Sequence, residues 1–295
     1  MSHWRTIAMN AYYYGSLPTR PLLRHWLGRR GTAPLGVLFY HRIADNHPND
    51  WTMSNDGFRQ QMMWLKQHVD LVSLDELQQR LRSGKNDRVA IAITFDDGYA
   101  ENCDQAIPLL VDQEIPATYF VALDFIVNGK AFPHDVKHGQ PLAANTPHQI
   151  REMAAAGISI GAHTRTHCDV GAIDDAASMR DEIVSARNEL EDLAGTSVTH
   201  FAFPYGMPAN LSRAAEWLCR QEGLHGVCSA FGAYNHPGQD PFHIRRFHAD
   251  PEFTRFLNWT TVDARKLSHY RDFQIPESAL PLNALQEAEC SMANT

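Results

Sequence analysis

Two adjacent carboxylates, Asp96 and Asp97, follow Val89–Phe95, the most hydrophobic run of the chain. Like charges a few ångströms apart oppose joint ionisation, and a bound cation relieves that cost. Successive side chains of a strand point to opposite faces, so one carboxylate can bind a metal ion while its neighbour has another role. The alternative is an ordinary Asp-Asp-Gly turn, since both residue types favour tight turns. This pair alone leaves both interpretations open.

Two histidines, His163 and His167, stand four residues apart directly after the apolar run Ile158–Ala162. Imidazoles at this spacing converge if the chain coils through one turn, and neutral imidazole is a common ligand of zinc and similar divalent ions. The chain holds 16 histidines, so chance pairs also occur. The neighbouring Cys168 fits a buried inert thiol better than a ligand.

A third run, Val198–Phe203, leads into Pro204, Tyr205 and Gly206. Proline and glycine fix a sharp turn, which directs backbone N–H groups around Tyr205 into the open face. Such donors at the end of a strand are what an oxyanion hole requires. A plain Pro–Gly turn is the alternative.

The elements that must position these residues alternate along the chain. Amphipathic helical segments separate seven apolar runs, most of which lack polar alternation, as expected of strands buried on both faces. The runs are Gly36–His41, Val89–Phe95, Ala117–Ala122, Ile158–His163, Val198–Phe203, Leu224–Cys228 and Phe242–Phe247. This alternation predicts an α/β fold with a mostly parallel sheet, open or closed into a barrel. The three chemical motifs would then meet at the carboxyl ends of the strands.

Together the motifs resemble the polysaccharide deacetylase (NodB homology) domain, carbohydrate esterase family 4. Thr94-Phe95-Asp96-Asp97-Gly98 is similar to the first motif of that family, His163-Thr164-Arg165-Thr166-His167 to the second, and Phe201–Gly206 to the third. The segments Leu38–Ile43, Phe58–Leu65 and Val72–Leu74 resemble its branch associated with bacterial exopolysaccharide systems. The resemblance covers roughly residues 35–250. It implies a single-domain, distorted (β/α) barrel with about seven parallel strands, similar to a TIM barrel.

The resemblance also implies a role for each matched residue. Asp97, His163 and His167 would bind one divalent metal ion, zinc first, with cobalt, nickel or iron as alternatives. Asp96 would be the general base, and a metal-bound water molecule the nucleophile. Three protein ligands leave a coordination position for that water, whose pKa falls from about 15.7 towards about 7 on zinc. Pro204 and Tyr205 would form the turn whose N–H stabilises the oxyanion.

The sequence departs from the family pattern at two positions, so other residues must orient the base and supply the general acid. Ala202 stands where many members carry the arginine that orients the base, so we expect Arg246, with Arg245 as the alternative, to pair with Asp96. No clear Leu-x-His motif supplies a general acid late in the chain, and His248 is the nearest match in place. Strand alternation puts Arg246 and His248 on one face. For His41, at the end of the first run, we expect a structural or substrate-contact role.

Composition restricts the class of protein and its partners. The 295 residues carry a formal net charge of −8, which argues against a protein that grips nucleic acid with its whole surface. Five cysteines without a C-x-x-C pair fit free thiols in a reducing compartment. With no signal peptide recognised, we expect a cytoplasmic protein.

We divide the chain into a basic N-terminal arm (1–34), the deacetylase-like barrel (35–255) and a C-terminal extension (256–295).

The arm holds five arginines, no acidic residue and several aromatic side chains, including Trp4 and Trp26. Two alternatives follow: the arm packs over the rim of the barrel, or it rests on an anionic membrane surface.

For the whole chain we expect a metal-dependent hydrolase of carbon–nitrogen bonds other than peptide bonds. It would remove N-acetyl groups from an amino-sugar-containing polysaccharide or lipid-linked glycan precursor. The alternatives are a deacylase for formyl or O-acetyl groups, and a non-catalytic carbohydrate-binding barrel.

Overall fold

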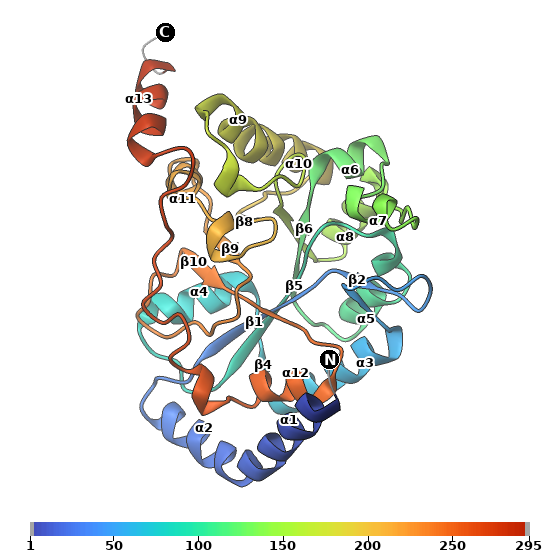
Figure 1. Ribbon diagram of the computed structural model, residues 1–295, viewed down its shortest axis with the longest axis vertical. Helices are drawn as coiled ribbons and strands as arrows, with labels where there is room; N and C mark the ends of the chain where they lie inside the picture. The colour runs from blue at the N-terminus through green and yellow to red at the C-terminus, as the bar shows by residue number, and fades with distance from the viewer. Residues whose placement is uncertain (1–2, 293–295) are drawn as a thin grey trace.

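The computed structural model describes residues 3–292, and Figure 1 shows its α/β architecture. Residues 1–2 of the expected arm and 293–295 of the expected extension lie outside the described range. The strands are β1 (Leu35–Tyr40), β2 (Arg42–Ile43), β3 (Thr52–Met53), β4 (Asp70–Leu71), β5 (Ala90–Phe95), β6 (Ala117–Val121), β7 (Ser159–Ala162), β8 (His200–Ala202), β9 (Gly226–Ser229), β10 (His243–Arg245) and β11 (Phe247–His248).

Helices connect the strands. They are α1 (His3–Ser16), α2 (Arg20–Arg29), α3 (Asn55–His68), α4 (Leu74–Ser83), α5 (Ala106–Asp112), α6 (Leu123–Asn128), α7 (Pro133–Lys137), α8 (Pro147–Ala155), α9 (Ala176–Arg180), α10 (Ala186–Ala194), α11 (Arg213–Gln221), α12 (Phe253–Thr260) and α13 (Leu282–Met292), with a π-helical turn at Asp181–Ser185. None of the helices in the described range has the length and hydrophobicity that crossing a bilayer requires.

The main sheet is parallel and nearly closed. Its strands follow the order β10-β9-β8-β7-β6-β5-β1-β11, with β4 added beside β5. β10 pairs with β9 and β11 pairs with β1, while only Arg246 separates β10 from β11. The run 243–248 therefore bridges the two edges and closes the barrel. Counting that run as one strand gives seven strands around the barrel, as expected from the sequence, and β4 is an eighth strand beside β5.

Strand alternation divides the core into an interior and an outer layer. Inward side chains of the strands, including Val37, Ala92, Phe120 and Ala202, form one buried cluster that also contains leucines of α4. The remaining buried strand residues pack against the surrounding helices. Small inward residues leave space near the carboxyl ends of the strands, where the polar residues lie.

Both ends of the chain are helical and pack on the barrel. α1 contacts α12, and α12 contacts α3. The boundary expected at residue 255 falls within α12, a helix whose buried Phe256 belongs to the main core.

Candidate active site

Asp97, His163 and His167 converge at the carboxyl ends of β5 and β7. One ligand atom from each lies within 4.8 Å of the other two. Asp97 Oδ1 is 3.5 Å from His163 Nε2 and 3.1 Å from His167 Nε2, and this oxygen is buried without a hydrogen-bond partner. Burial opposes ionisation of Asp97, but the facing imidazoles outweigh it and hold the pKa of this carboxyl well below its usual range. A carboxylate and two imidazoles around an unsatisfied oxygen fit a divalent ion such as zinc.

Unusual backbone geometry orients these ligands. Asp97 has a φ of 74°, Thr164 of 62°, His167 of 58° and Tyr205 of 62°. These four are half of the eight non-glycine residues with positive φ in the described range. Such conformations cost of order 1–3 kcal/mol each and concentrate at functional sites. The sequence runs themselves carried no signal for this strain.

A second layer of contacts holds the histidine loop. His163 Nδ1 lies 2.7 Å from the carbonyl oxygen of Ala202, which directs Nε2 towards Asp97. Glu182, in the π-helical turn, accepts hydrogen bonds from the backbone N–H groups of Arg165 and Thr166 and from the Thr166 hydroxyl. Partners of this kind fix the orientation of metal ligands.

Asp96 points into the barrel and is paired there with Arg246. The guanidinium donates from both terminal nitrogens, 2.6 Å to Oδ1 and 2.8 Å to Oδ2 of Asp96. Both side chains are buried, and burial by itself raises the pKa of a carboxyl. The guanidinium outweighs that effect, so the pKa of Asp96 is lowered and the group is ionised at neutral pH. Arg246 also donates to Thr94 Oγ1 and to the Ser229 carbonyl oxygen.

The packing around Arg246 explains how it reaches Asp96. Its guanidinium carbon lies 5.2 Å from the centre of the Phe39 ring and 5.3 Å from that of Phe120. Ala202 belongs to the same interior cluster as Phe120, and its small side chain leaves room for the guanidinium. Arg245, the alternative partner, points away and donates to Gln239 and to the Phe273 carbonyl oxygen.

The Pro204–Gly206 turn forms one rim of the site. Tyr205 is exposed, and its ring lies 5.2 Å from that of His167. Gly206 is required here, because a Cβ atom would come within 2.7 Å of the Ala230 backbone nitrogen. The turn therefore brings the Tyr205 backbone close to the metal ligands.

A pocket of about 370 Å³ contains this cluster. Its walls combine the polar residues with aromatic and apolar side chains, namely Phe39, His41, Trp51, Asp96, Asp97, His134, His163, His167, Phe203, Tyr205, Met207 and Ala230. Trp51 and His134 also line an adjoining pocket of about 430 Å³. Sequence patterns predict no chemistry for Trp51, His134 or Met207, because none of these residues belongs to a recognised motif.

The two histidines outside the metal triad differ in position. His41 lines the pocket, its ring lies 4.6 Å from that of Trp51, and its Nδ1 is buried without a hydrogen-bond partner. The His248 ring is tilted against that of Phe39 at 5.3 Å and lies 5.8 Å from that of Trp51, and the residue lines a second pocket together with Met9 and Trp259. Burial lowers the pKa of both, that of His248 to about 4.

Comparison with known proteins agrees with the fold and the motifs. Residues 83–225 match the family model for polysaccharide deacetylase. This segment, just under half of the chain, is similar to the polysaccharide deacetylase family, a family of hydrolases. The segment contains the Asp96–Asp97, His163–His167 and Pro204–Gly206 motifs.

Relatives and one solved structure extend the match. YxkH of Bacillus subtilis (strain 168), itself assigned to the polysaccharide deacetylases, is 27% identical over 183 residues, covering 61% of this chain and 60% of the relative. The chitooligosaccharide deacetylase of Rhizobium leguminosarum bv. trifolii is 33% identical over 100 residues, covering 34% and 38%. The matched segments span 60% or less of these relatives. IcaB from Ammonifex degensii has the same fold, with a TM-score of 0.63 at 24% identity over 78% of this chain and 97% of that one.

Proposed function

We propose that this chain is a metal-dependent deacetylase that removes N-acetyl groups from an amino-sugar-containing polysaccharide or lipid-linked glycan precursor. One observation carries the proposal: an unsatisfied carboxylate oxygen faces two imidazoles beside a separately paired carboxylate, all in one pocket. The family match and the deacetylases among the relatives support the same reaction class.

A divalent ion held by Asp97, His163 and His167 would polarise the acyl carbonyl and acidify a water molecule. The protein then has three tasks. Asp96 accepts a proton from the attacking water, and its pairing with Arg246 keeps it ionised and oriented. The Tyr205 N–H donates a hydrogen bond to the oxygen that becomes negative in the tetrahedral intermediate.

The third task is protonation of the departing amine. His41 suits it better than His248, because its imidazole lines the same pocket as Asp96 and has an unpartnered Nδ1. Burial lowers the pKa of His41, so its ring is neutral in the free enzyme at neutral pH. The proton that it passes to the amine is then the one that Asp96 has taken from the attacking water.

The aromatic walls support a glycan as substrate. Phe39, Trp51 and Tyr205 line the pocket and present apolar surface on which sugar rings can pack. The adjoining pocket shares Trp51, so the two hollows form neighbouring sites for successive units of an oligosaccharide. This arrangement favours an oligomeric or polymeric substrate over a single sugar.

The test is acetate release from a chitooligosaccharide by protein reconstituted with zinc, cobalt, nickel or iron. We expect acetate from wild type, none from Asp97→Asn, and metal without turnover from Asp96→Asn. Release of formate, or of acetate only from an O-acetylated glycan, would reassign the acyl group. Stoichiometric metal with no acid released from any glycan would contradict catalysis and favour the carbohydrate-binding alternative.

A further inference from the structure

The outer face of the two N-terminal helices is apolar although it faces solvent. Trp4, Ile7, Ala8, Ala11 and Tyr14 of α1 are all exposed. Their spacing of three and four residues places them on one side of the helix. Trp4 is 78% exposed and Tyr14 63%. An amphipathic helix normally turns such a stripe towards the core, so this side of α1 lacks the partner that its composition calls for.

The opposite side of α1 accounts for its attachment to the barrel. Tyr13 is buried, and the Tyr12 hydroxyl donates to Asp263 over 2.7 Å. Arg20, at the start of α2, is buried. It donates hydrogen bonds to the side chains of Asn258, in α12, and Thr261, directly after that helix. The arm therefore packs on the barrel (Figure 1, blue helices). Its apolar stripe is left on the solvent side.

The same pattern continues on α2. Leu22 is 71% exposed and Trp26 52%, and these residues stand one helical turn apart. We define the α1–α2 face as the exposed side chains of Trp4, Ile7, Tyr14, Leu17, Leu22 and Trp26. It holds six of the thirteen large exposed apolar side chains found in residues 3–292, so the clustering is not a general feature of the surface.

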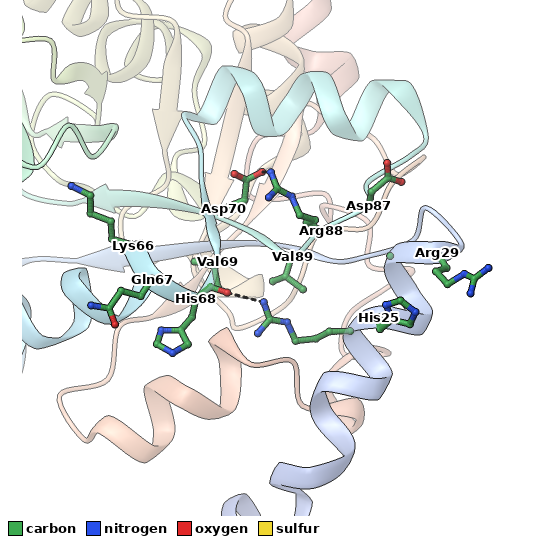
Figure 2. A pocket seen from close by; sticks show the side chains of 12 residues that line it. His25, Arg29, Lys66, Gln67, His68, Val69, Asp70, Asp87, Arg88 and Val89 are labelled. Atoms are coloured by element: carbon green, nitrogen blue, oxygen red, sulfur yellow. Dashed lines mark hydrogen bonds and ion pairs between the residues drawn. The ribbon is translucent and has the colours of Figure 1, made fainter.

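Positive charge adjoins this face. Arg29 and Arg30 are exposed at the end of α2, and the Arg30 guanidinium lies 4.7 Å from the Trp26 ring. A pocket of about 860 Å³ opens beside α2, and Figure 2 shows His25 and Arg29 on one wall and Lys66 and Arg88 on others. Two acidic residues, Asp70 and Asp87, also line it, and Asp70 forms ion pairs with Arg80 and Arg88. The lining therefore keeps an excess of basic groups.

We propose that the α1–α2 face docks the protein on the surface of an anionic phospholipid bilayer. Trp and Tyr side chains enter the interfacial region, Leu22 and Ile7 reach towards the acyl chains, and the neighbouring arginines meet lipid phosphates. A second copy of the chain fits less well. A contact between two copies of this face would bring two sets of arginines into one interface, and residues 1–34 contain no acidic side chain to pair with them.

Docking through the α2 end of this face leaves the catalytic pocket open. α2 lies at the amino ends of β1 and β5, since Thr32 bridges to Asn86 just before these strands begin. The pocket with Asp96 and Asp97 lies at their carboxyl ends. Membrane binding and turnover of a soluble substrate are therefore separable, and the proposal does not depend on the proposed function.

The experiment is co-sedimentation of the whole chain with vesicles of phosphatidylcholine alone or mixed with phosphatidylglycerol. We expect wild type to pellet with the mixed vesicles and to be released by high salt. The double variant Leu22→Glu, Trp26→Glu should bind at least tenfold more weakly. The matched control is Val111→Glu, an exposed apolar position on α5, and it should bind as wild type does. Circular dichroism and metal content check that each variant is folded.

Three results would overturn the proposal. The first is wild type that stays in the supernatant with phosphatidylglycerol vesicles. The second is equal pelleting of the double variant and wild type. The third is a wild-type dimer in sedimentation velocity that the double variant abolishes while neither protein binds vesicles, which would assign the face to a second copy.

Discussion

At the scale of single residues, the buried pair Asp96–Arg246 is the most consequential feature. A carboxylate removed from water keeps its charge only when a partner compensates for the lost hydration. Arg246 does so with two parallel hydrogen bonds, the strongest geometry available to these groups. The same contact keeps the proposed base from rotating away from the pocket.

We predict that Arg246→Met lowers kcat by about 100-fold while leaving bound metal unchanged. Without the guanidinium, the pKa of Asp96 rises and the base loses its orientation. The acid limb of the pH–rate profile should therefore move to higher pH. Because truncation leaves a buried charge unpaired, a loss of about 3–5 kcal/mol in unfolding free energy is also expected. Urea denaturation and metal analysis check these outcomes.

The double variant Arg246→Ala, Ala202→Arg tests the role by relocation. Ala202 lies in the interior cluster beside Phe120, against which the Arg246 guanidinium packs. An arginine at 202 should reach Asp96 and recover at least tenfold in kcat over Arg246→Ala. A folded double variant without any recovery would argue that the position of Arg246, and not only its charge, is required.

The proton donor gives a second prediction at this scale. His41→Gln should lower kcat by about 100-fold, because His41 lines the pocket. His248→Gln should stay within about threefold of wild type, because His248 lines a different pocket. Both variants should keep their metal. The reverse ranking would restore His248 as the acid.

At the scale of elements, the π-helical turn Asp181–Ser185 supports the histidine loop. Glu182 holds two successive backbone N–H groups and one hydroxyl of that loop. π-helical turns are rare and often occur near functional sites. Here the turn brings a carboxylate under the loop that carries His163 and His167.

We predict that Glu182→Gln weakens zinc affinity by about tenfold, since partners behind metal ligands typically contribute 10–100-fold. The amide can accept fewer of the three hydrogen bonds and carries no charge. Glu189→Gln is the matched control: Glu189 pairs with Arg165 at the surface, where such ion pairs contribute little. Competition with a zinc indicator measures both. Equal affinities for the two variants would rule out the supporting role of Glu182.

At the scale of the whole molecule, buried histidines set the response to acid. Burial lowers the pKa of His200 and His236 to about 4, and that of His243 to about 3. The usual value is about 6.5, so between pH 6.5 and about 4 the unfolded chain takes up protons that the folded chain does not. Stability should therefore be full above pH 6.5 and fall as the pH decreases through this range.

His243 alone should account for about 2 kcal/mol of the loss between pH 7.5 and 5. Its Nε2 lies 2.9 Å from Ser229 Oγ on the outer side of the sheet, where burial and, to a smaller extent, the positive charges of Arg245 and Arg220 disfavour the protonated ring. Urea denaturation at the two pH values should show a smaller pH effect in His243→Gln than in wild type. An identical pH dependence in both proteins would remove His243 as a cause.

The sequence by itself determined the strand runs, the alternating α/β class and the motif residues, while the closed barrel was expected only from the family resemblance. Local patterns control these features: unbroken apolar runs require burial on both faces, and Asp96–Asp97, His163–His167 and Pro204–Gly206 each lie within a few residues of a strand end. The resemblance to the polysaccharide deacetylase family followed from the same motifs, and the family model matches the segment that contains them.

Only the tertiary structure decided which distant residues meet. The sequence offered both Arg245 and Arg246, and strand direction in the closed barrel turns only Arg246 towards Asp96, 150 positions away. It gave His41 no catalytic role, yet barrel closure brings this side chain into the pocket. Nor did sequence patterns distinguish the packed side of α1 from its solvent side, because both carry aromatic residues. Such contacts depend on closure of the sheet and on packing between segments, which local periodicity does not encode.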